Sequence, residues 1–305
     1  MRKLVVGCGY LGLRVAVAWL QDGHEVFALT RSSERGEYLS SLGIQPCVGD
    51  VTCPESLGDL PDVNTVLYAV GFDRRSQASR HRVYIDGLNN TWRALQNRSE
   101  RWFYISSTSV YGVSDGSFVD ESTPCEPTSE AGRVCWQAEQ TLHAHAQDSS
   151  VEHVILRSAG IYGPDRLLRR VADVKAGNPL AGRPDSFLNL IHVDDIQAAV
   201  LAAEHHSQSG QTYLISDGQQ LTRGEYFRLL AQLLAAPEPT FDPQATPART
   251  SGLNKRCRIE KAIRDLQWQP QYATAESGLR QSLAATGAAD GPNPGPPPAS
   301  DKGGG

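Results

Sequence analysis

The chain has 305 residues, of which 40% are hydrophobic and 21% charged, which is enough to build a sizeable core and excludes a mini-protein. No apolar run approaches the roughly 20 residues that cross a bilayer, so we expect no membrane partner. The formal net charge is −5, from 29 basic and 34 acidic residues, and this balance gives no electrostatic footprint for nucleic acid. These properties favour a small-molecule substrate.

The amino terminus and the cysteines bear on the cellular compartment. The apolar stretch that begins at Leu4 meets Gly7 after three residues, whereas the hydrophobic region of a signal peptide needs about 7–15. The six cysteines lie far apart, and none forms a Cys-x-x-Cys or stands beside a histidine at metal-ligand spacing. We therefore expect a cytoplasmic protein with reduced thiols and no metal site.

Short strand-like runs alternate with helix-length amphipathic segments in the first half of the chain, the pattern typical of parallel strands joined by crossover helices. The predicted strands are Lys3–Val6, Glu25–Leu29, Ile44–Val48, Thr65–Ala69, Trp102–Ser106 and His153–Arg157. The predicted helices between them are Leu11–Gln21, Ser33–Ser41, Gln77–Asn97 and Ser129–Ala146. The sequence therefore predicts an α/β fold with a doubly wound parallel sheet.

The alternation ends after Arg157, where loops punctuated by Gly and Pro begin. The segments predicted beyond this point are a helix near Asp194–His205, a strand Thr212–Ser216 and a helix Arg223–Leu234. We expect residues 176–285 to form a smaller substrate-binding lobe that can return elements to the sheet. Of the last 20 residues, 11 are Gly or Pro, so residues 286–305 are expected to be a disordered tail.

A glycine pattern follows directly after the first predicted strand, where Gly7-Cys-Gly9-Tyr-Leu-Gly12 forms a Gly-x-Gly-x-x-Gly at the start of the first helix. Gly7 permits the tight turn, Gly9 lets the backbone approach a pyrophosphate, and Gly12 lets helix and strand pack closely. The amino terminus of the helix adds N–H donors and a positive dipole. Residues 1–175 are thus predicted to be an NAD(P)-binding Rossmann domain, with a plain β-turn-α corner as the alternative.

The end of the second predicted strand bears on the choice of cofactor. An NAD-preferring site usually has an Asp or Glu there, which accepts hydrogen bonds from the ribose, but this chain has Thr30-Arg31-Ser32. Arg31, together with Thr30, Ser32 and Arg35, would hold a 2′-phosphate through charge-assisted hydrogen bonds. The alternative is an exposed arginine that opens a polar helix. We expect NADP(H) to be favoured and NAD(H) to be possible.

Other residues around the same site are also candidates for cofactor binding. Asp50, which follows the third predicted strand, either contacts the adenine edge or belongs to an ordinary Gly-Asp turn. The remaining residues expected at the cofactor are Tyr10, Leu11, Val51, Ala69, Val70, Gly71 and Ser106.

At the fifth predicted strand, Ser106-Ser107-Thr-Ser-Val-Tyr111-Gly112 resembles the Ser-Ser-x-x-Val-Tyr-Gly segment of extended short-chain dehydrogenases/reductases, the NAD-dependent epimerase/dehydratase-like family. Further matches are Asp86-Gly87, Glu121 to Pro127, Ala138-Glu139-Gln140, Leu156-Arg157 to Tyr162-Gly163-Pro164, and Ile191 to Asp195. The resemblance covers about residues 1–283. It implies that Ser107 hydrogen-bonds the carbonyl or hydroxyl group of the substrate.

The catalytic Tyr-x-x-x-Lys pair of that family has no counterpart in this chain. In the family, the Lys lowers the pKa of the Tyr and holds the nicotinamide ribose. Alignment on Ala138-Glu139-Gln140 puts Ala131 and Cys135 at the two positions, and Tyr84 stands where the family has a helix Asn. None of the ten tyrosines is followed four residues later by a lysine. The chain is therefore identified as an atypical member, related to a subgroup with the fold and the cofactor loop but without the pair.

The remaining groups favour reduction over oxidation. An epimerase or dehydratase must first take a proton from a hydroxyl, and a phenol of pKa about 10 with no cation nearby is a poor base at neutral pH. Reduction of a carbonyl requires only that a neutral Tyr or water protonate an alkoxide while Ser107 stabilises the charge. We expect NADPH-dependent reduction of a small carbonyl or conjugated substrate. The alternatives are an NAD-dependent nucleotide-sugar epimerase or dehydratase, and a non-catalytic NADP(H)-binding redox sensor.

Three side chains are candidates for the proton donor, Tyr84 first and then Tyr111 and His192. Each has a structural alternative, which is ring packing for the two tyrosines and a helix start capped by acidic residues for the segment around His192. Arg157 and Tyr162 are expected to contact the substrate. A homodimer is possible, because the resemblance implies pairing through the fourth and fifth helices.

Overall fold

The computed structural model describes residues 1–73, 77–242 and 253–286. Its centre is a seven-stranded parallel sheet in the order β11-β7-β5-β4-β1-β2-β3. The strands are β1 (Arg2–Val6), β2 (Glu25–Thr30), β3 (Gln45–Val48), β4 (Val63–Tyr68), β5 (Ser99–Ser107), β7 (Glu152–Ser158) and β11 (Gln211–Ile215). The chain runs outward from β1 on one side and then resumes on the other, so the predicted doubly wound α/β class is confirmed.

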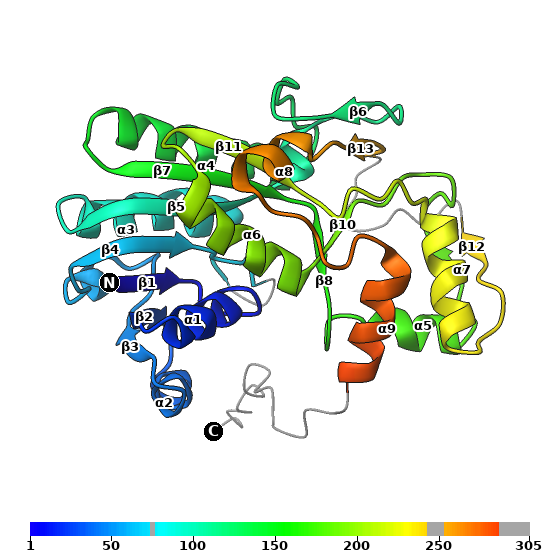
Figure 1. Cartoon of the computed structure of the whole chain (residues 1–305), viewed down its shortest axis with the longest axis horizontal. Helices are drawn as coiled ribbons and strands as arrows, with labels where there is room; N and C mark the ends of the chain where they lie inside the picture. The colour runs from blue at the N-terminus through cyan, green and yellow to red at the C-terminus, as the bar shows by residue number, and fades with distance from the viewer. Residues whose placement is uncertain (74–76, 243–252, 287–305) are drawn as a thin grey trace, which may run out of the picture.

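Helices cover both faces of this sheet (Figure 1). On one face lie α1 (Gly12–Gln21), α2 (Ser33–Ser41), α6 (Val193–His206) and α8 (Glu260–Leu266); on the other lie α3 (Gly87–Leu95) and α4 (Glu130–Gln147). Trp19 and Ile196 belong to the first hydrophobic cluster, and Trp92 and Leu142 to the second. Because both faces are buried, a central strand such as β1 reads as a continuous apolar run, Leu4-Val5-Val6.

Most of the remaining elements form a lobe beside the carboxyl ends of the strands (Figure 1). Its helices are α5 (Leu168–Lys175), α7 (Arg223–Leu233) and α9 (Ala275–Ala285), which enclose a third hydrophobic cluster. Three short parallel pairs lie outside the main sheet: β8 (Gly160–Tyr162) with β10 (Leu190–His192), β9 (Leu180–Ala181) with β12 (Phe241–Asp242), and β6 (Phe118–Val119) with β13 (Arg256–Cys257). Residue 176 is the predicted start of the lobe. Leu167 and Val174, which precede it, belong to the core of the lobe. The elements α6, β11 and α8, which follow it, belong to the sheet and its helical layer. Of the expected tail, residues 287–305 lie outside the described part of the chain.

The predicted helix Gln77–Asn97 differs from the structure. A π-helical turn, η2 (Arg82–Asp86), precedes α3, which begins at Gly87. A Cβ at Gly87 would lie 2.8 Å from the Val51 side chain, so this crossing requires glycine. π turns are rare in proteins overall, but those that occur are often found at functional sites. This one carries Tyr84. The ends of the other predicted segments agree with the structure to within three residues, but α5, α8 and α9 were not predicted.

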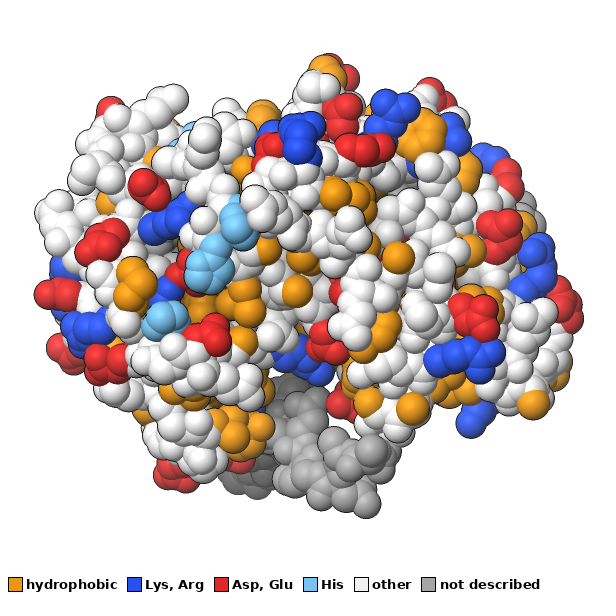
Figure 2. Space-filling view, viewed as in Figure 1, with side chains coloured by type: hydrophobic (Ala, Val, Ile, Leu, Met, Phe, Trp, Pro, Cys, Tyr) orange, Lys and Arg blue, Asp and Glu red, His pale blue; other side chains and the backbone are white. Residues whose placement is uncertain are grey.

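The surface shows no large region of a single charge on the face drawn in Figure 2, where acidic and basic side chains are interspersed. All six cysteines are free thiols. Within residues 1–73, 77–242 and 253–286, no three His, Cys, Asp or Glu side chains are grouped to hold a metal ion. No helix of the same described residues is long and apolar enough to span a membrane.

Candidate functional site

A cleft of about 530 Å³ opens at the carboxyl ends of β1, β2, β4 and β5. It is the position at which doubly wound sheets bind ligands, because the loops on the two sides of β1 diverge there. The predicted site residues that line it are Gly7, Gly9, Tyr10, Leu11, Thr30, Arg31, Asp50, Val51, Ala69, Val70, Gly71, Tyr84, Ser106 and Ser107. Residues spread over a hundred positions of the sequence therefore meet in one cleft.

The three glycines of the loop between β1 and α1 differ in what surrounds them. Gly7 has a φ of +97°, and a Cβ there would lie 2.5 Å from the Ala69 backbone. A Cβ at Gly12 would lie 2.4 Å from the Gly7 carbonyl oxygen, so Gly12 serves helix–strand packing and does not line the cleft. A Cβ at Gly9 would meet nothing within 4 Å. The backbone at Gly9 is therefore open to a ligand, as a pyrophosphate site requires.

Arg31 lines the β2 end of the cleft, and Arg35 lies beside the glycine loop. The Arg31 side chain is 61% exposed and its guanidinium is 3.8 Å from the Asp73 carboxylate. The Arg35 guanidinium donates to the Cys8 carbonyl oxygen at 3.4 Å, which holds it beside the glycine loop. Ser32 does not line the cleft, because its hydroxyl caps α2 by accepting from the Arg35 N–H. Arg31 thus brings a guanidinium to this end of the cleft, which Asp50 and Asp73 also line.

Asp50 lies in the turn after β3 and lines the same end of the cleft. Its Oδ1 accepts from both the N–H and the hydroxyl of Thr52, each at 2.8 Å. The two alternatives for Asp50 are therefore compatible, since one carboxylate oxygen stabilises the turn while the residue borders the cleft.

Ser107 and Tyr84 lie at the β5 end of the cleft. The Ser107 hydroxyl accepts from the Ser109 N–H at 3.1 Å, which fixes the oxygen at the end of β5. The Tyr84 hydroxyl accepts from the Phe72 N–H at 3.1 Å. Cys135, on α4, lines the cleft as well, and burial raises the pKa of its thiol, which keeps it protonated. The β5 end thus carries neutral hydroxyl and thiol groups.

Behind this end of β5 lies a buried ionic network. Arg157, 5% exposed, places Nη2 2.7 Å from Oε2 of the fully buried Glu139 and donates from Nη1 to the Tyr111 hydroxyl at 2.9 Å. The Ser106 hydroxyl donates to the same carboxylate. Burial raises the pKa of Tyr111, against the opposing effect of Arg157. Neither Tyr111, expected as a proton donor, nor Arg157, expected at the substrate, lines the cleft, because each is engaged in this network.

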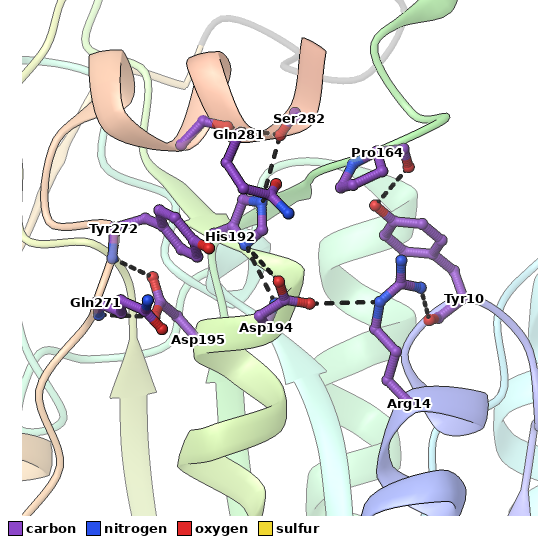
Figure 3. A network of polar contacts seen from close by, with 11 residues as sticks. Tyr10, Arg14, Pro164, His192, Asp194, Asp195, Gln271, Tyr272, Gln281 and Ser282 are labelled. Carbon is purple, nitrogen blue, oxygen red and sulfur yellow. Dashed lines mark hydrogen bonds and ion pairs between the residues drawn. The ribbon is translucent and has the colours of Figure 1, made fainter. Parts of the chain in front are cut away.

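Neither His192, which Figure 3 shows beneath α9, nor Tyr162 lines the cleft. His192 is fully buried at the start of α6, where Nδ1 accepts from the Asp194 N–H and Nε2 lies 2.9 Å from Gln281 Oε1 on α9. Burial lowers the pKa of His192 and favours the neutral ring. The Tyr162 ring meets His192 edge-on at 5.3 Å, within the lobe core. The structure therefore gives His192 the helix-capping position and Tyr162 a packing position.

Several residues that line the cleft were not predicted from the sequence, among them Cys8, Thr52, Asp73, Tyr104, Ile161 and Arg166. The Arg166 guanidinium stacks over the Tyr10 ring at 4.1 Å, and the Tyr10 hydroxyl donates to the Pro164 carbonyl oxygen at 2.8 Å (Figure 3). The glycine loop is thereby joined to the loop after β8. A signal for Arg166 lay in its place just after the Tyr-Gly-Pro motif, whereas no pattern distinguished Tyr104 from other strand residues.

Known proteins resemble this chain over most of its length. The model of the NAD dependent epimerase/dehydratase family matches residues 4–216. Protein YeeZ of Escherichia coli K12 is 29% identical over 282 residues, covering 89% of this chain and 97% of that protein. Human short-chain dehydrogenase/reductase family 42E member 1 is 32% identical over 266 residues, covering 77% of this chain and 67% of that protein.

A solved structure shows the same fold. UDP-glucose 4-epimerase from Thermotoga maritima superimposes with a TM-score of 0.78 at 19% identity, covering 93% of this chain and 98% of that one. At this level of identity the likeness establishes the architecture and leaves the reaction open. The family match spans well over half of the sequence, and the protein therefore belongs to the NAD dependent epimerase/dehydratase family of extended short-chain dehydrogenases/reductases.

Proposed function

We propose that this protein binds NADP(H) and uses it to reduce a small carbonyl or conjugated compound. The observation that carries the proposal is that one cleft is lined by the glycine loop, Arg31, Tyr84 and Ser107. A dinucleotide whose pyrophosphate lies on the loop reaches the arginine with its adenosine half and β5 with its nicotinamide half.

The choice of NADP(H) rests on charge at the β2 end. A 2′-phosphate accepts charge-assisted hydrogen bonds, and guanidinium groups donate them in a fixed planar geometry. Arg31 is exposed, and its ion pair with Asp73, at 3.8 Å and in contact with solvent, is a weak competitor for a phosphate. Arg35 is held at the same loop by the Cys8 carbonyl.

The β5 end supports reduction. When bound, the reduced nicotinamide supplies a hydride to the substrate carbon. Ser107, held by the Ser109 N–H, donates a hydrogen bond to the substrate oxygen and stabilises the negative charge that develops there. Tyr84 then gives that oxygen a proton and recovers one from solvent, which balances the conversion of a carbonyl to an alcohol.

The same geometry disfavours the epimerase and dehydratase alternatives, which need a base to remove a hydroxyl proton. Tyr111 and His192 lie outside the cleft, burial raises the pKa of Tyr111, and both ring nitrogens of His192 are engaged, by the Asp194 N–H and by Gln281 Oε1. The thiol of Cys135 lines the cleft, but burial raises its pKa. A hydride acceptor needs no such base, so reduction is the reaction for which these residues suffice.

The cofactor choice predicts that the protein binds NADPH more tightly than NADH. Replacing Arg31 with Asp removes a charged hydrogen bond to the 2′-phosphate and adds repulsion, so the Kd for NADPH should rise at least about tenfold while that for NADH changes little. Nicotinamide fluorescence titrations measure both constants. Arg183→Asp, an exposed position that does not line the cleft, is the matched control. If the protein binds NADH more tightly than NADPH and Arg31→Asp changes neither Kd, the proposed preference for NADP(H) is wrong. If it binds neither cofactor, the proposed cofactor site is wrong.

The catalytic proposal predicts that Ser107→Ala lowers the rate of NADPH oxidation with carbonyl substrates by about 10²–10³-fold, the usual effect of removing one donor to a developing oxyanion. The affinity for NADPH should change less than about threefold, because Ser107 contacts the substrate. Steady-state rates across a panel of aldehydes and ketones, with the Kd as an internal reference, test this. Tight NADPH binding without turnover on any member of the panel, and no difference for Ser107→Ala, would favour a redox sensor.

A further inference from the structure

Tyr104, on β5, has a buried hydroxyl group that no described residue hydrogen-bonds. The residue is 1% exposed and lines the cleft, yet its Oη has no partner within hydrogen-bond geometry. An unpaired buried hydroxyl is unfavourable, and nearly all such groups in folded proteins find a partner. The position of this one, in the wall of a ligand cleft, points to a partner that arrives with the ligand.

The surroundings of the hydroxyl keep it protonated, so that it can donate a hydrogen bond. Its neighbours in the wall are Tyr68, whose ring stacks at 5.8 Å, and the cleft-lining residues Tyr84 and Cys135. Burial, followed by the effects of Cys135 and Tyr68, raises the pKa of Tyr104 well above its ordinary value. The phenol therefore keeps its proton at physiological pH, and what it lacks is an acceptor.

Tyr104 differs from the other unpaired phenols of the described residues. Tyr68 and Tyr162 also have buried hydroxyls without partners, but neither lines the cleft. The Tyr68 hydroxyl lies against α3, where a Cβ at Gly87 would be 3.2 Å from it. The Tyr162 ring is buried in the lobe core beneath Gly278 of α9. The hydroxyls of all three are closed to solvent, but of the three residues it is Tyr104 that lines the cleft a ligand would fill.

The position of Tyr104 along β5 determines which part of the ligand is within its reach. It precedes Ser106 by two residues, so both side chains leave the strand on the face covered by α4. Arg31 marks the opposite, adenosine end of the cleft. We propose that Tyr104 donates a hydrogen bond to a ribose hydroxyl of the nicotinamide half of the bound cofactor, an inference that rests on the proposed function.

Two variants that each remove one buried, unpaired oxygen test this. Tyr104→Phe should weaken NADPH binding about 3- to 10-fold, the usual effect of one neutral hydrogen bond. Tyr68→Phe, the matched control from the same aromatic stack, should leave the Kd unchanged. Tyr104→Phe should not lower the Tm of the ligand-free protein, because the Tyr104 hydroxyl has no hydrogen bond there to lose. The adenosine half-ligand 2′,5′-ADP should bind wild type and both variants alike.

The outcomes separate this inference from the proposed function. If wild type binds neither NADPH nor 2′,5′-ADP, the cofactor site itself is wrong. If wild type binds NADPH and Tyr104→Phe binds it equally tightly, the role of Tyr104 is overturned while the function stands. If Tyr104→Phe weakens the binding of 2′,5′-ADP and of NADPH equally, the variant distorts the cleft as a whole. That result would also overturn the role of Tyr104.

Discussion

Replacing Arg157 with Met is expected to lower the free energy of unfolding by about 3–5 kcal/mol, because it leaves the fully buried Glu139 carboxylate without its cation. Three hydrogen bonds from the guanidinium to this carboxylate are lost together, along with the one to Tyr111. The network connects α4, β7 and the end of β5, so the loss falls on the frame that holds Ser107. Urea unfolding at neutral pH measures the change.

Two controls identify the charge as the cause. The double variant Arg157→Met with Glu139→Leu removes both ions and should recover most of the stability, since apolar replacement of a buried pair is often neutral. Arg280→Met breaks an exposed i, i+4 pair with Glu276 on α9 and should change the free energy of unfolding by only about 0.3–0.5 kcal/mol. An Arg157→Met variant as stable as Arg280→Met would contradict the importance of the buried pair.

The sheet and the cofactor loop could be predicted because their signals are local. A strand buried on both faces reads as an apolar run, and the turn between β1 and α1 needs glycine at a positive φ, so Gly7 is visible in the sequence alone. The residue at the end of β2 could be predicted in the same way. Once the strand was placed in the sequence, Arg31 was the residue that follows it. These features depend on chemistry within a few residues and do not require the rest of the fold.

The elements that the sequence did not reveal depend on distant partners. Helix α9 covers His192 from 89 residues away, and this contact decides that the imidazole is enclosed (Figure 3). The sequence pattern of residues 185–195 gives no sign that α9 will pack over His192. The π turn that carries Tyr84 directly precedes Gly87, which packs closely against Val51 on a separate part of the chain.

Residue type alone also fails to separate catalytic from structural uses. Arg157 and Tyr111 are the residue types that bind anions and donate protons, and the same properties suit them to a buried network around Glu139. Tyr104 shows the converse, because a strand tyrosine reads as ordinary core until its unpaired hydroxyl and its place in the cleft wall are seen. Burial and partners, which only the fold supplies, decide between the two uses.

The glycine loop offers a pair of variants that separates folding from binding. Gly7→Ala is expected to lower the free energy of unfolding by about 3 kcal/mol or more, because its Cβ would lie 2.5 Å from the Ala69 backbone at a φ of +97°. Gly9→Ala should leave stability nearly unchanged, since its Cβ meets nothing within 4 Å. Its methyl group would instead fill the space that a pyrophosphate approaches, so NADPH binding should weaken about 10- to 100-fold. Urea unfolding and fluorescence titration measure the two effects.

The contrast between the two variants is informative because they are two residues apart and receive the same substitution. If Gly9→Ala binds NADPH as tightly as wild type, the pyrophosphate does not lie against this backbone, and the placement of the whole dinucleotide along the cleft is wrong. If Gly9→Ala instead destabilises the protein as much as Gly7→Ala, the loop is a packed corner of the fold, the alternative that the glycine pattern allowed from the start. If Gly9→Ala loses NADPH binding but keeps its stability, ligand binding explains why position 9 is glycine.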